Sequence, residues 1–169
     1  EHFGESVCIS SDTVVVGAPG EPGVLGSTYI FSRNVGGSNN WGLAKNITAD
    51  NDSGLGQSVS ISEGTVVVGA HREDDMGYNS GSAYIFERNQ GGPDNWGQVK
   101  KILADDGAAD DNFGFCVSIC DDTVVIGAQY HDDNGTDSGS AYIFCRNVGG
   151  PDNWGLVKKI NAGDPSAHE

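Results

Sequence analysis

The sequence contains three copies of one pattern, and this internal repeat restricts the possible folds more than any other feature. The segment from Gly81 to Lys101 returns almost unchanged from Gly139 to Lys159, and in a more divergent form from Gly26 to Lys45. Successive spacings between matching residues of the copies are 52 to 58 residues. A period of this size is typical of solenoids, propellers and other arrays in which each repeat is one supersecondary unit. The copies correspond to residues 1–54, 55–112 and 113–169.

Four short candidate strands make up each repeat. In the first copy they are Phe3 to Ser10, Thr13 to Ala18, Ser27 to Arg33 and Gly42 to Ala49. They are bordered by glycine, aspartate, asparagine, serine or proline, which are the residues that form turns. No stretch keeps the spacing of apolar residues that an amphipathic helix needs. We therefore expect a chain that is nearly all β.

The residues on these strands indicate their order within a sheet. The second and third strands of each repeat are apolar on both faces, which predicts burial between two sheets. All five lysines lie on the fourth strand, and lysine is typical of an exposed sheet edge. Buried central strands with a charged rim describe the blade of a β-propeller. The prediction is an all-β fold of three four-stranded antiparallel repeats of propeller-blade type, with a solenoid as the alternative.

The charge of the protein argues against several classes of partner. Twenty-four acidic residues oppose nine basic ones, which gives a formal net charge of −15. Nucleic acids and anionic membrane surfaces are bound through lysine and arginine, so we expect neither. No apolar run exceeds about six residues, far below the roughly 20 that cross a bilayer as a helix. We therefore also expect no membrane span.

The cysteines do not follow the repeat. Cys8, Cys116, Cys120 and Cys145 occupy positions that are not all shared between copies, whereas a disulfide belonging to the repeat would return in each one. Cys120 and Cys145 could form one disulfide if they face each other across neighbouring strands. The alternative is a set of small, free thiols.

Two acidic loops are candidates for calcium binding. Both place carboxylates around a glycine turn, and carboxylate and amide oxygens are the ligands that calcium prefers. The residues concerned are Asp132, Asp133, Asn134 and Asp137 in the third repeat and Asp74 and Asp75 in the second. These loops predict a Ca²⁺ site, and the alternative is a pair of solvated acidic turns.

Three asparagines lie in the Asn-x-Ser/Thr pattern that accepts N-linked glycans in a secretory pathway. They are Asn46, Asn51 and Asn134. A glycan on Asn134 would compete with calcium in the same loop, so the two hypotheses exclude each other there.

Catalytic signatures are weak. His71 and His131 do not recur in register, and no Gly-x-Ser-x-Gly nucleophile motif is present. We therefore expect a protein that is not an enzyme. The tyrosines and tryptophans of the repeat, among them Tyr84 and Tyr142, could form a shelf on which a sugar stacks. The alternative is that these rings are buried between blades.

The motifs at the start of each repeat carry a family resemblance. Phe-Gly-x-Ser-Val, followed by Val-Val-Gly-Ala-Pro at Val15 to Pro19, resembles the FG-GAP repeat of integrin α-subunit propellers and of many secreted microbial proteins. The resemblance covers essentially the whole chain and implies a β-propeller in an extracellular or cell-surface location. The proline survives only as Pro19, with His71 and Gln129 in its place in the other copies.

One part of the family pattern is missing. Integrin-like repeats carry a calcium loop between the Phe-Gly strand and the Gly-Ala-Pro strand. Here this connection is two residues long, as in Ser11-Asp12, which is too short to surround an ion with six to eight oxygens. The resemblance therefore implies no calcium at that position.

Three blades are fewer than the four to eight of a closed propeller. We expect the open ends to be covered by further repeats of a longer chain or by identical copies, giving a homo-oligomer or a filament. The expected function is an extracellular, non-enzymatic structural or adhesion module that associates through blade faces. The alternative is a lectin-like or receptor-like domain that binds a glycan or protein ligand.

Overall fold

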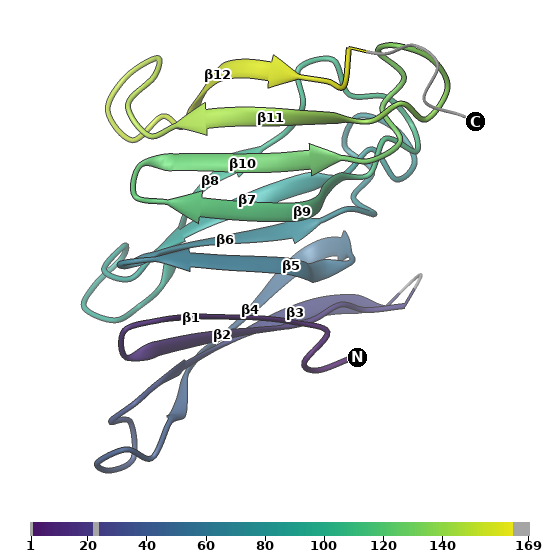
Figure 1. Ribbon diagram of the computed structural model, residues 1–169. Coiled ribbons are helices and arrows are strands. Elements are labelled where there is room, and N and C mark those ends of the chain that lie inside the picture. Colours follow the sequence, from purple (N-terminus) through teal and green to yellow (C-terminus); the bar gives the residue numbers. More distant parts are fainter. Residues whose placement is uncertain (1, 22–23, 164–169) are drawn as a thin grey trace.

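The computed structural model of the protein describes residues 2–21 and 24–163, without the side chains of residues 49–53. These residues form twelve strands (Figure 1). The strands are β1 (Ser6–Ser10), β2 (Thr13–Ala18), β3 (Leu25–Ser32), β4 (Gly42–Ser53), β5 (Leu55–Ser62), β6 (Thr65–Ala70), β7 (Ser82–Glu87), β8 (Gly97–Ile102), β9 (Phe113–Cys120), β10 (Thr123–Ala128), β11 (Ser140–Cys145) and β12 (Gly155–Ile160). Within the described ranges there is no helix with the length and apolarity to cross a membrane.

The strands form three antiparallel sheets of four, each in the order of the sequence: β1 to β4, β5 to β8 and β9 to β12. Figure 1 shows the sheets stacked face to face from the N-terminal sheet to the C-terminal one. The expected fold of three propeller-type blades is confirmed, and the stack is not closed into a ring. The lysine-bearing strands β4, β8 and β12 lie at the outer edges, as expected.

A tight turn connects the first and second strands of each sheet. Ser11, Glu63 and Asp121 each open a two-residue hairpin with a φ of 50° to 52°, the left-handed conformation that tight hairpins require. One strand differs from the expectation. β4 continues past Ala49 to Ser53, because β3 begins early, at Leu25, and pairs with this extension after a register shift.

Each sheet has two different apolar faces. In the second sheet the aromatic face carries Tyr84, Phe86 and Trp96, and the aliphatic face carries Val67 and Ile85. The aromatic face of the second sheet packs on the aliphatic face of the first, and the aromatic face of the third packs on the aliphatic face of the second. Both contacts therefore have the same direction along the stack.

The glycine of the Val-Gly-Ala motif is required by this stacking. A Cβ at Gly17 would lie 2.0 Å from the carbonyl oxygen of Gly56, and a Cβ at Gly69 would lie 1.9 Å from that of Gly114. Gly56 and Gly114 belong to the first strand of the following sheet. The backbone of each new blade thus fits against the preceding glycine, where no side chain can be accommodated.

A row of serines joins the inner strands of the second and third sheets. Ser58 accepts a hydrogen bond from the backbone N–H of Val117 at 3.0 Å, and Ser60 accepts one from Ile119 at 3.1 Å. Ser62 does the same for Asp121 at 3.0 Å. β9 has a strand partner on one side only, so these hydroxyls satisfy N–H groups that its free edge would otherwise leave unpaired.

Candidate functional site

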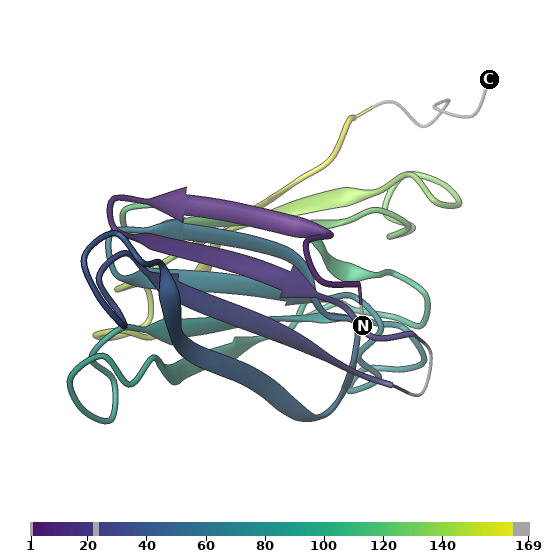
Figure 2. The same ribbon diagram turned by 90° about the horizontal axis from the view of Figure 1, so that it is seen from below.

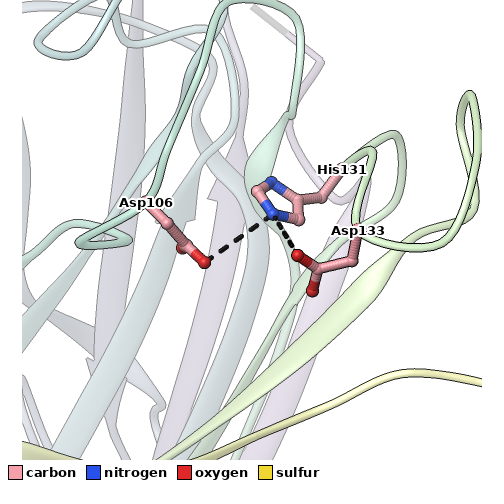
Figure 3. A group of neighbouring side chains, drawn as sticks. All are labelled: Asp106, His131 and Asp133. Carbon is pink, nitrogen blue, oxygen red and sulfur yellow. Dashed lines mark ion pairs between the residues drawn. The ribbon is translucent and has the colours of Figure 1, made fainter.

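A lysine lies at the centre of a charged cluster of the third sheet. The Nζ atom of Lys159, on β12, lies 2.6 Å from Oδ2 of Asp106 and 2.6 Å from Nε2 of His131. It also forms an ion pair with Asp133. Figure 3 shows the side chain of Asp106, from the β8–β9 connection, and those of His131 and Asp133, both from the β10–β11 connection, pointing toward one another. The ammonium thus lies where three potential ligands converge.

Buried partners fix the orientation of His131. Its Nδ1 atom lies 2.7 Å from Oδ2 of Asp111, and both side chains are buried. The same carboxylate oxygen accepts the backbone N–H of Ala108 at 2.7 Å. Because an ionised carboxylate only accepts hydrogen bonds, Nδ1 carries the proton and Nε2 is free to accept from Lys159.

The ion pairs shift the titration of these groups. The hydrogen bond from Lys159 lowers the pKa of Asp133 to about 2. Burial opposes ionisation of Asp106, but hydrogen bonds from Lys159 and Tyr142 outweigh it and lower its pKa. Burial lowers the pKa of Lys159, yet the two carboxylates raise it overall. Asp106, Asp133 and Lys159 are therefore all ionised at neutral pH.

A related cluster lies in the second sheet. Lys101 pairs with Glu73 and Asp75, each at 2.6 Å, and its ammonium lies 5.3 Å from the centroid of the Tyr84 ring. The hydrogen bond from Lys101 lowers the pKa of Asp75. Lys159 lies at 5.2 Å over Tyr142 in the same way. Both lysines pair with a tyrosine in the register of their sheet, so the two clusters are equivalent by position.

The first sheet lacks the cluster altogether. Asn46 is paired with Tyr29 where the other sheets have lysine, and the first repeat has no counterpart of the Asp-Asp pair. The lysine and its acids are thus present together or absent together. This joint occurrence indicates that the lysine holds the acidic loop onto the outer strand.

The third-sheet cluster has a composition that could hold a metal ion. Asp106, His131 and Asp133 each offer one ligand atom, and these atoms lie within 4.8 Å of one another. The expected calcium ligands are only partly included. Asp132 instead accepts the backbone N–H of Asp137 at 2.8 Å, which shapes the loop.

The calcium-ligand candidates of the second repeat are also engaged in contacts within the protein. Asp74 accepts the backbone N–H of Asn79 at 2.7 Å, while Asp75 faces Lys101. Asn134 donates its backbone N–H to the hydroxyl of Ser138 at 3.1 Å. The acidic loops are therefore organised chiefly by internal hydrogen bonds, and only Asp133 of the six expected residues belongs to the triad.

A model of the FG-GAP repeat matches residues 1–31, 41–86 and 96–144 of this chain. The chain belongs to the FG-GAP repeat family. The family expected from the Phe-Gly and Val-Gly-Ala motifs is thereby confirmed. No curated protein matches the sequence.

Among solved structures, this FG-GAP protein is similar to a europium-containing methanol dehydrogenase, with 8% sequence identity and a TM-score of 0.57. The similarity covers 90% of this chain but only 23% of the dehydrogenase chain. The FG-GAP protein thus spans less than a quarter of its neighbour's length, and at this identity the likeness concerns the fold alone.

The cysteines of the FG-GAP protein are all free thiols, so the expected disulfide between Cys120 and Cys145 is not formed. The reason is the strand order. Both residues are paired with Thr123, one from each side, so β10 lies between them. Two strand spacings amount to about 9.6 Å, beyond the reach of a disulfide.

The predicted glycan acceptors differ in accessibility. Asn46 is exposed on β4, and Asn134 is half-buried in the loop between β10 and β11. Asn51 lies outside the residues whose side chains the structure describes. Glycosylation at all three sites stays a prediction.

The repeat tyrosines and tryptophans of the second and third sheets are unsuited to a sugar-binding shelf. Tyr84, Tyr142, Trp96 and Trp154 are buried between the sheets, which was the alternative expectation. Arginine guanidinium groups cover the tryptophans, with Arg146 at 4.8 Å from the centre of the Trp154 ring. The glycan-binding alternative therefore loses the rings of the second and third sheets, whereas Trp41 of the first sheet is only half-buried.

His71 is a buried histidine outside the charged clusters. Its ring lies edge-on to Phe115 with centroids 5.5 Å apart, and Nδ1 has no hydrogen-bond partner in the described part of the chain. Burial, with a smaller contribution from Arg72, lowers the pKa of His71 to about 4. The side chain is therefore neutral at physiological pH and packs as an apolar group.

Proposed function

We propose that this FG-GAP protein is an extracellular, non-enzymatic structural or adhesion module that associates through the faces of its blades. Assembly of this kind would give a larger propeller, a surface assembly or a filament. The observation that carries the proposal is the exposure, at both ends of the stack, of apolar positions that the middle sheet buries.

The first sheet exposes its aromatic face. Figure 2 looks onto this face from the end of the stack. Val7 is 67% exposed, whereas Val59, at the same position of the second repeat, is 7% exposed. Phe3 is 59% exposed, whereas its counterpart Phe113 is completely buried.

The third sheet exposes its aliphatic face. Ile160 is 42% exposed, whereas Ile102, its counterpart in the second sheet, is 3% exposed. Val125 is also exposed, although the equivalent Val67 is fully buried. Exposed apolar residues that share one face of a sheet are typical of an interaction site. Both ends of the described stack therefore favour association.

An extracellular location is supported by the family. FG-GAP repeats resemble those of secreted and cell-surface proteins, and the strongly acidic composition leaves no basic surface for nucleic acid. The buried histidines and the lysine-filled charged cluster support a non-enzymatic role, since neither offers an open, water-accessible base.

A divalent cation enters this proposal only as a competitor of Lys159. We propose that calcium, or any other divalent ion, binds Asp106, His131 and Asp133 by displacing the lysine ammonium. The support is that the ammonium already contacts all three residues. Two cations so close together would repel each other strongly.

Sedimentation velocity over a concentration series tests the proposed association. We expect the wild-type mass to exceed that of one chain and to rise with concentration. The Val7→Lys variant places a charge on the exposed aromatic face and should remain a single chain at the same concentrations. A wild-type protein that stays monomeric up to its solubility limit contradicts the proposal.

A further inference from the structure

Building on the proposed self-association, we infer that the contact is head to tail: the aromatic face of the first sheet of one copy packs on the aliphatic face of the third sheet of the next. The contact then repeats the step that relates neighbouring sheets within the chain. A second copy of this chain is the partner, and its first sheet takes the place of a fourth blade.

The direction of packing is the first argument. Both internal contacts join an aromatic face to an aliphatic face, and neither joins two faces of the same kind. The two faces left exposed are one of each, the aromatic face around Val7 and the aliphatic face around Val125. A head-to-tail contact reproduces the side-chain complementarity that the chain already uses twice, whereas a symmetric contact would not.

The glycine of the third sheet is the second argument. Gly17 and Gly69 each lie against the carbonyl of the next sheet, as described above. A Cβ at Gly127, the equivalent residue of β10, would meet only Cys116 of its own sheet, at 2.5 Å from the Sγ atom and 3.8 Å from the backbone oxygen. No carbonyl of another sheet lies there in the described chain.

The residue that would supply this carbonyl lies at the other end of the stack. Gly4 matches Gly56 and Gly114 in the repeat, and a Cβ built on it has no atom within 4 Å. The carbonyl of Gly4 in one copy is therefore positioned to lie against Gly127 of another.

The inner strands supply the third argument. Cys116, Ser118 and Cys120 occupy the positions of the serine row of β5, and all three are exposed on the third sheet. On the first sheet, β1 has a free inner edge. By their position in the repeat, the N–H groups of Val7 and Ile9 on this edge correspond to those of Val117 and Ile119 in β9, which donate to the serines of β5.

In the head-to-tail contact, the Cys–Ser–Cys row of one copy therefore accepts hydrogen bonds from β1 of the next. Hydroxyl and thiol groups both act as acceptors, the thiol more weakly. Such a contact is heterologous, so it yields a ring if the rotation closes and an open filament if it does not.

Two variants, each blocking one end, test the direction. Ile9→Lys blocks the aromatic face and Val125→Lys blocks the aliphatic face, both at exposed positions. Each variant alone should lose association and scatter light as a single chain. An equimolar mixture should form a complex of two chains and nothing larger, because one complementary pair of faces remains.

The native thiols report which face is covered. In the mixture, Cys116 and Cys120 of the Ile9→Lys chain should be protected from a thiol-labelling reagent, while those of the Val125→Lys chain should react as in the isolated chain. The two chains are distinguished by mass. Val7→Lys and Ile160→Lys provide a second pair in case one of the first variants fails to fold.

The outcomes separate the two proposals. The head-to-tail contact is overturned if the wild type associates but one variant still associates alone, or if the mixture stays monomeric. Association would then use other surfaces. A monomeric wild type overturns the proposed function and this contact together.

Discussion

A Cβ added at Gly69 would lie 1.9 Å from the carbonyl oxygen of Gly114. This contact between the second and third sheets explains in physical terms why the Val-Gly-Ala motif contains glycine and why it follows a Phe-Gly motif. Each motif is half of a contact with the neighbouring blade. The spacing of the two motifs therefore sets the stacking of the repeats.

Gly69→Ala should destabilise the protein, because the added methyl group forces the second and third sheets apart. Overpacking of a tight contact costs about 1–3 kcal/mol, and urea denaturation would measure the loss. The matched control, measured at a concentration at which the protein is a single chain, is Gly127→Ala combined with Cys116→Ala, since the thiol is the nearest obstacle at that position. A control that is destabilised as much as Gly69→Ala would show that the contact between sheets is not the cause.

Lys159→Met should destabilise the third sheet, because Asp106 and Asp133 lose their counter-charge while remaining close together. Asp106 is 50% exposed and Asp133 28% exposed, so the loss should be about 1 kcal/mol, closer to that of an exposed ion pair than to that of a buried one. Thermal and urea denaturation measure the loss. Lys158→Met, at the exposed neighbouring position, should change stability little. Equal effects of the two substitutions would contradict a role for the cluster.

Metal binding should depend on the same lysine. In Lys159→Met, calcium or zinc should raise the melting temperature more than in the wild type, because the ligand atoms of Asp106, His131 and Asp133 are no longer occupied by an ammonium. Zinc suits the imidazole ligand better than calcium does. Lys101→Met is the control, since its cluster has Glu73 in place of histidine. Identical shifts in wild type and Lys159→Met would rule out competition.

The free energy of unfolding at low pH should depend on Asp133. Its pKa is lowered from 3.8 to about 2 by Lys159, so the folded state favours the ionised form. The contribution to stability is complete above pH 3.8 and is lost as the pH falls toward 2. Asp133→Asn should flatten this part of the profile, whereas Asp132→Asn, which can still accept the N–H of Asp137, should not. Parallel profiles for wild type and Asp133→Asn would refute the assignment.

His71 should produce a second pH dependence at higher pH. Its pKa falls from 6.5 to about 4 on folding, so the unfolded state binds more protons between these values. Stability should therefore decrease as the pH falls from 6.5 to 4, by up to about 3 kcal/mol. His71→Gln, which introduces the residue found at Gln129, should remove this dependence. Urea midpoints measured across the range decide the matter.

The sheets could be predicted from the sequence, whereas the charged cluster could not. Turn residues and strands that are apolar on both faces, such as Thr65–Ala70, are local features of the sequence. A strand that is apolar on both faces indicates burial wherever it occurs. The cluster joins Asp106, His131 and Lys159 from three separate connections and strands. The sequence did contain one signal of the cluster. The first repeat lacks both the acidic pair and a lysine opposite Tyr29.

The disulfide prediction failed for a related reason. Cys120 and Cys145 end two strands that pair with the same central strand, so they lie on opposite sides of Thr123. Sequence spacing alone does not distinguish adjacent strands from strands one apart. The order of the strands, which the three-dimensional sheet fixes, was needed to separate the two cases.

Hydrogen exchange of the β1 amides, measured at low and high protein concentration, tests most directly whether the end faces associate. Val7 and Ile9 lie on the free edge of the first sheet and are exposed to solvent in a single chain. Association through blade faces predicts that exchange at these two amides slows as the concentration rises, while exchange in the exposed β3–β4 turn does not change. Rapid exchange at Val7 and Ile9 at every concentration would contradict the account.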